Sequence, residues 1–136
     1  MKIISRDELM ALDAGVIYCE YEQQVFGDLN IKHDTSYKTL EGSDYIYGRD
    51  NINKPRSDKS QPIDWYMHQL LELGCSDERD HKLNSNASFS LDHECIGRDG
   101  CFANDQLYAV LEVNDLVKMQ ILIEKAMIVS PNWSIG

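Results

Sequence analysis

The sequence lacks the segments and motifs that define the commonest functional classes. No apolar run reaches the roughly 20 residues that span a bilayer, and no basic and apolar leader stands at the N-terminus. A phosphate-binding P-loop, a dinucleotide fingerprint, a nucleophile elbow and a zinc-protease helix are also missing. These absences argue against a membrane protein and against an enzyme of a common class, and we expect a cytoplasmic protein.

Basic residues are scarce. The chain has 13 Lys and Arg residues against 23 Asp and Glu residues, which gives a formal net charge of −10. A field of this sign repels phosphate backbones and attracts basic surfaces. The composition therefore disfavours direct binding to nucleic acid and favours a protein partner with a basic surface.

Disulfides are not needed to hold this chain together. Its 136 residues are 43% hydrophobic, which suffices for the core of one domain spanning residues 1–136. Without an export signal, we interpret the four cysteines as reduced thiols. They are Cys19, Cys75, Cys95 and Cys101.

The segment 105–128 is the strongest structural signal in the sequence. Residues 107–112 are apolar and predict a buried strand, and Asn114 is a candidate N-cap for the helix that follows. One side of this helix is expected to cover the sheet, and its apolar residues are Leu116, Met119, Leu122, Ile123, Ala126 and Met127. A second, narrower apolar side is formed by Val117, Ile121 and Ile128. It predicts contact with a partner protein or with a second copy in a homodimer.

The remaining elements are predicted from periodicity and turn residues. The capping-box pattern from Ser5 to Glu8 begins a short helix over 6–12, and a second helix is predicted over 63–73. Strands are predicted at 16–22, 24–32, 44–48 and 107–112, with a further candidate at 88–96. Residues 33–42 are polar and predict a turn, and flexible loops are expected near 49–61 and 76–90. The predicted fold class is α+β, an antiparallel sheet of four to five strands packed by two main helices.

Trp65 falls on the polar side of the predicted helix over 63–73. Two interpretations fit this position. The preceding loop covers the indole, or the indole is an exposed aromatic anchor for a partner.

A group of Cys and His residues raises the question of a metal or thiol site. His93 and Cys95 would share one face of a strand, and Cys101 follows closely. Zinc sites commonly use ligand pairs two to four residues apart, and this spacing differs from that pattern. We therefore expect no metal and no cofactor. A small metal-binding or thiol-dependent enzyme centred on His93, Cys95 and Cys101 stays as the alternative.

Two stretches resemble small phage and prophage proteins. They are residues 3–32 (IISRDELMALDAGVIYCEYEQQVFGDLNIK) and 97–126 (GRDGCFANDQLYAVLEVNDLVKMQILIEKA). The resemblance implies an anti-defence protein, such as an anti-CRISPR inhibitor, that binds a host defence complex through its surface. We predict contact with a basic, nucleic-acid-handling surface. The candidate partner-binding residues are Glu20, Glu22, Trp65, Asp77, Glu78, Val117 and Ile121.

Overall fold

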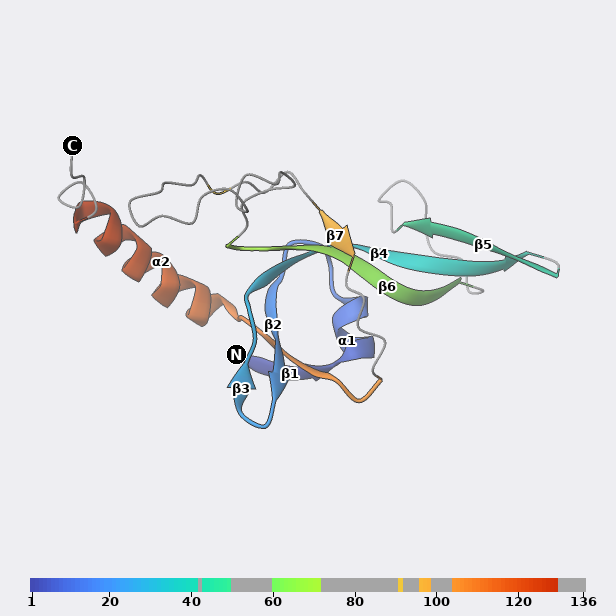
Figure 1. The fold of residues 1–136 in the computed structure, drawn as a ribbon, viewed down its shortest axis with the longest axis horizontal. Helices are drawn as coiled ribbons and strands as arrows, with labels where there is room; N and C mark the ends of the chain where they lie inside the picture. Colours follow the sequence, from blue (N-terminus) through green and yellow to red (C-terminus); the bar gives the residue numbers. More distant parts are fainter. Residues whose placement is uncertain (42, 50–59, 72–90, 92–95, 99–103, 130–136) are drawn as a thin grey trace, which may run out of the picture.

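The fold is one curved antiparallel sheet with one short and one long helix (Figure 1). The computed structural model describes residues 1–41, 43–49, 60–71, 91, 96–98 and 104–129. Its strands are β1 (Lys2–Ser5), β2 (Ile17–Glu22), β3 (Val25–Phe26), β4 (Asn30–Glu41), β5 (Asp44–Arg49), β6 (Ser60–Gln69), β7 (Gly97–Arg98) and β8 (Leu107–Val110). Its helices are α1 (Arg6–Ala11) and α2 (Val113–Val129).

The order of the strands in the sheet differs from their order in the chain. The main path is β1-β8-β2-β4-β6-β7, with β3 paired to β2 and β5 paired to β4. Strand β8 therefore lies between β1 and β2. Ala109 on β8 pairs with Ile3 on one side and with Cys19 on the other. Strand β4 is the longest strand in the described part of the chain. One end of β4 pairs with β2, and the other end pairs with β5 in the arm seen in Figure 1.

The core lies inside the curve of the sheet. Trp65 on β6 and Tyr108 on β8 have ring centroids 5.6 Å apart, although β2 and β4 separate their strands in the sheet. Tyr18 on β2 packs edge-on against both rings. Helix α1 contacts β1, β8 and β6, and it adds the fully buried Leu9 and Met10 to this aromatic cluster. The curvature thus gives a small sheet a closed interior.

The local signals at the N-terminus are confirmed. Ser5 Oγ accepts from the Glu8 backbone N–H and Glu8 Oε1 accepts from the Ser5 backbone N–H, both at 3.2 Å. This reciprocal capping box fixes the start of α1 at Arg6, as predicted. The predicted strands at 16–22, 44–48 and 107–112 are also present, as β2, β5 and β8.

The expected turn over 33–42 is wrong, because β4 continues through it to Glu41. Two of the buried polar side chains on β4, those of Lys32 and Thr35, are hydrogen-bonded. Lys32 Nζ donates to the backbone carbonyls of Leu12 and His33 and to Thr35 Oγ1, at 2.8, 3.1 and 2.9 Å. Thr35 Oγ1 in turn donates to the Met10 carbonyl at 2.8 Å. Burial of satisfied polar groups costs little, so the strand tolerates a composition that is typical of loops.

The expected helix over 63–73 is also wrong, because this sequence forms strand β6 up to Gln69. Ile63, Trp65 and Met67 alternate at the period of a strand, and Ile, Trp and Tyr favour strands. Pro62 has no backbone N–H and pairs with Tyr37, where the register shifts. Burial covers both faces of the strand, including Asp64, Trp65 and His68.

The predicted packing of the sheet by two main helices is therefore incorrect. Of the two helices among the described residues, α2 is the long one, and none of its 17 residues is buried. Figure 1 shows α2 extending away from the sheet, with its C-terminal end farthest from it. The apolar side expected to cover the sheet is exposed instead, as Leu122 (64%), Ile123 (56%) and Met127 (67%) show.

The start of α2 also differs from the prediction. The helix begins at Val113, and the Glu112 backbone N–H donates to Asp115 Oδ2 at 2.9 Å. Asn114 therefore lies inside the first turn and is not the N-cap. The ammonium group of Met1 lies 2.7 Å from the same carboxylate, and these two contacts lower the pKa of Asp115. Within the described residues, we find no helix with both the length and the apolar character needed to cross a membrane.

Candidate functional site

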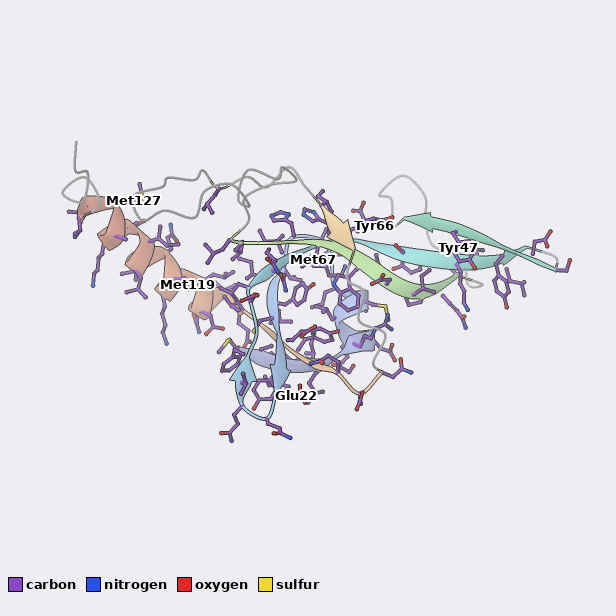
Figure 2. All side chains as sticks on the ribbon, in the orientation of Figure 1. Glu22, Tyr47, Tyr66, Met67, Met119 and Met127 are labelled. Carbon is purple, nitrogen blue, oxygen red and sulfur yellow. The ribbon has the colours of Figure 1, made fainter. Side chains whose placement is uncertain are left out.

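Two of the predicted acidic contact residues lie on one strand. Glu20 and Glu22 alternate along β2, so they share one face of the sheet, and both are exposed. Figure 2 shows Glu22 at the end of the β2–β3 hairpin, pointing away from the sheet. The other two predicted acidic residues, Asp77 and Glu78, lie outside the described residues.

A cleft of about 390 Å³ opens beside this hairpin. It lies where the end of β2 meets the residues that lead into β8, and its charged residues are both carboxylates, Glu22 and Asp105. The rest of the lining is formed by Tyr21, Gln23, Gln106 and Leu107. Carboxylates and amide oxygens accept hydrogen bonds from Arg and Lys, so the cleft has the chemistry to bind a basic side chain.

Hydrogen bonds from the Gln106 side chain to backbone carbonyls and a strained turn hold the cleft in shape. Gln106 Nε2 donates to the carbonyl of Leu107 at 2.8 Å, and it lies 3.4 Å from the carbonyl of Tyr21 across the cleft. The hairpin turns through Gln23 and Gln24, which both have positive φ, at 48° and 67°. Residues other than Gly, Asn and Asp rarely adopt this conformation, and such strain is often found at functional sites.

Apolar side chains are exposed on the same hairpin. Val25 and Phe26 follow the turn and are 67% and 49% exposed, and the Phe26 ring lies 5.3 Å from the ring of Tyr21. Aromatic residues are enriched at protein interfaces, so the exposed Phe26 ring is a candidate contact next to the cleft. Phe26 was not among the contact residues predicted from the sequence, although the alternation of the predicted strand placed it on one side with Asp28, Asn30 and Lys32.

The candidates Trp65, Val117 and Ile121 differ in accessibility. Trp65 has no exposed surface, and its indole N–H donates to Tyr18 Oη at 2.7 Å. It belongs to the core, so it offers no surface to a partner. Val117 and Ile121 are 46% and 47% exposed on α2.

The Cys and His alternative falls outside the described residues. His93, Cys95 and Cys101 all lie there, as do Cys75 and His81. Among the described residues, no group of three or more His, Cys, Asp or Glu side chains is arranged to hold a metal ion. Cys19 is the described cysteine, and it is buried on β2.

We predict that the Cys19 thiol is protected from alkylation in the folded protein. Burial raises the pKa of Cys19 above its ordinary value of 9.0, which lowers the thiolate fraction near neutral pH. Since the folded state holds this proton more tightly, the thiol stabilises the fold below pH 9 and loses that contribution at higher pH. Iodoacetamide labelling followed by peptide mass spectrometry should show labelling of Cys19 at least about tenfold slower in native than in urea-unfolded protein. Equal rates would contradict the burial.

Two histidines that the sequence did not connect lie in contact across β4 and β6. His33 Nε2 and His68 Nδ1 are 2.6 Å apart, and the rings are tilted at 36°. A hydrogen bond between two ring nitrogens needs one donor and one acceptor, so at least one imidazole is neutral. The prediction of a turn at His33 and a helix at His68 concealed this pair. Two imidazoles alone do not form a metal site.

The fold and the cleft together define a mainly β protein with an acidic surface site. No protein-family model, curated protein or solved structure matches the chain.

Proposed function

We propose that this chain is an acidic interaction protein that binds and inhibits a host defence complex, of CRISPR-like type, by contacting its basic, nucleic-acid-handling surface. The observation that carries the proposal is the cleft at the β2–β3 hairpin, whose charged residues are the carboxylates Glu22 and Asp105. The resemblance to phage proteins supplies the class of partner. The chemistry of the cleft supplies the means of recognition.

The charge of the whole chain supports the same partner. A net charge of −10 attracts a basic surface over a distance of about one Debye length, roughly 8 Å at physiological salt. Close contact then depends on the cleft, where a partner's Arg or Lys side chain meets Glu22 and Asp105. The exposed Phe26 and Val25 add apolar contact area beside this charge. Long-range attraction sets the association rate of the complex. Contacts at the cleft and at Val25 and Phe26 set its residence time.

The test is a pull-down of candidate host defence complexes with the wild-type protein and with two variants, each of which carries two charge reversals. Glu22→Lys with Asp105→Lys changes the cleft, whereas Asp13→Lys with Asp44→Lys changes two exposed carboxylates elsewhere by the same net charge. For a defence complex that the wild-type protein retains, we expect the cleft variant to bind at least about tenfold more weakly. This is a loss of ~1.4 kcal/mol in binding free energy. The matched control should change binding much less.

Salt provides a second measure in the same pull-down. Raising the salt from about 0.05 to about 0.5 M should weaken the wild-type complex strongly and the cleft variant less, because screening acts on the charges that the variant has lost. If candidate defence complexes are not retained at low salt, or if the two double variants bind equally, the proposal fails.

A further inference from the structure

We propose that α2 pairs in antiparallel orientation with α2 of a second copy of this chain, through its broad apolar side. The broad side is defined by Leu116, Met119, Leu122, Ile123, Ala126 and Met127. This inference is independent of the proposed partner, because it concerns the purified protein alone.

The helix α2 exposes many apolar residues. Apolar residues are normally exposed singly, whereas a helix that is apolar on most of its surface is normally buried. Eleven of the 17 residues of VNDLVKMQILIEKAMIV are apolar, and none is buried. Figure 2 shows Met119 and Met127 along this helix, away from the body of the sheet. Within the described residues, the apolar surface of α2 is therefore not covered by the rest of the fold.

The charge distribution favours a second copy over a basic partner for this surface. Asp115 and Glu124 balance Lys118 and Lys125, so α2 is electrically neutral within a chain of net charge −10. A neutral helix gains little from a basic partner, whereas the acidic hairpin gains much. The two surfaces thus suit different partners.

Antiparallel pairing resolves the repulsion between two acidic bodies. Each body is attached at the N-terminal end of α2, and a 17-residue helix is about 25 Å long at 1.5 Å per residue. Antiparallel helices place the bodies at opposite ends of the pair, roughly three Debye lengths apart at physiological salt. They also bring the acidic first turn, at Asp115, towards the Lys125 end of the second copy.

The broad side is self-complementary in this orientation. With a two-fold axis at the level of residue 121, Leu116 faces Ala126 of the second copy and Met119 faces Ile123 of the second copy. Apolar residues of the broad side therefore meet each other across the two-fold axis, as an isologous interface requires. Half of the curved surface of a helix about 25 Å long and about 10–12 Å in diameter is roughly 400–500 Å² per copy, below the ~800 Å² of a standard interface. The dimer should therefore form and dissociate with concentration.

The experiment measures molar mass by sedimentation equilibrium and light scattering, from about 1 μM to about 1 mM. Wild-type protein should rise from its chain mass of 15.6 kDa towards twice that value. Ile123→Glu, on the broad side, should stay monomeric throughout. Ile121→Glu makes the same substitution on the opposite side of the same helix and should dimerise like wild type. Both residues are exposed, at 56% and 47%, so neither change disturbs a core.

A charge pair tests the orientation. Leu116→Lys and Ala126→Glu should each abolish the dimer alone, and an equimolar mixture should restore it, because the two new charges meet only across an antiparallel pair. Three results would overturn the proposal: a wild-type monomer at all concentrations, a dimer broken by Ile121→Glu and not by Ile123→Glu, or a mixture that stays monomeric.

Discussion

Trp65→Ala is expected to lower the free energy of unfolding by about 3–5 kcal/mol, as is usual when a buried Trp is replaced by Ala. The indole has no exposed surface, and it packs edge-on against Tyr18 and Tyr108 at centroid distances of 6.2 and 5.6 Å. The Arg6 guanidinium lies 5.5 Å from the ring centroid and ties α1 to the same residue. Alanine leaves a cavity at the point where three strands and α1 meet.

Trp65→Phe is the matched control. It keeps an aromatic ring in the core and removes the indole N–H that donates to Tyr18 Oη at 2.7 Å. Loss of that hydrogen bond, together with a smaller cavity, should cost about 1–3 kcal/mol. Urea unfolding followed by circular dichroism measures both values. An alanine variant as stable as the phenylalanine variant would show that the cavity at Trp65 collapses or that the core is arranged differently.

Lys32→Met is expected to lower the free energy of unfolding by about 2–3 kcal/mol. Methionine keeps the length of the apolar stem, so the change isolates the ammonium group. Two effects oppose each other. Removing a buried charge relieves a desolvation cost, whereas the carbonyls of Leu12 and His33 and the hydroxyl of Thr35 lose a charged donor. We expect the second effect to prevail, since all three ammonium hydrogens have acceptors and the network joins α1 to β4.

Lys38→Met is the control for this prediction. It makes the same substitution on the same strand, where the Lys38 ammonium lies 5.2 Å from the Tyr45 ring centroid and is only half-buried. We expect a change of less than about 1 kcal/mol. Denaturant unfolding of both variants gives the comparison. A Lys32→Met variant at least as stable as wild type would mean that the desolvation cost exceeds the three hydrogen bonds.

The sequence predicted the elements that depend on neighbouring residues. The capping box at Ser5 and Glu8 and the strands at 16–22 and 44–48 each carry a local signal, and each is present. The prediction failed where a distant contact decides the conformation. The polar residues of β4 are stable in a strand because the Leu12 and Met10 carbonyls accept their hydrogen bonds. Neither partner is visible from the pattern around Lys32.

The candidate site was predictable only in part. Glu22 was predicted as an acidic contact residue on the strand over 16–22, and it is exposed on β2. Asp105 and Gln106 reach the same cleft because β8 pairs with β2 across more than 80 residues of sequence. The helix α2 was predicted correctly from its apolar periodicity. Such periodicity normally indicates packing on a sheet, but the apolar side of α2 is not covered by the sheet.

The position of β8 has a consequence for folding during synthesis. Strands β1 and β2 are synthesised before β8, and each pairs with one side of β8, at residues 107–110. The backbone N–H and C=O groups on the edges of β1 and β2 that pair with β8 stay unpaired until some 80 more residues have been made. Such long-range pairing slows folding, and unpaired strand edges are prone to aggregation. A chain truncated before Leu107 should therefore aggregate rather than form a smaller version of the sheet.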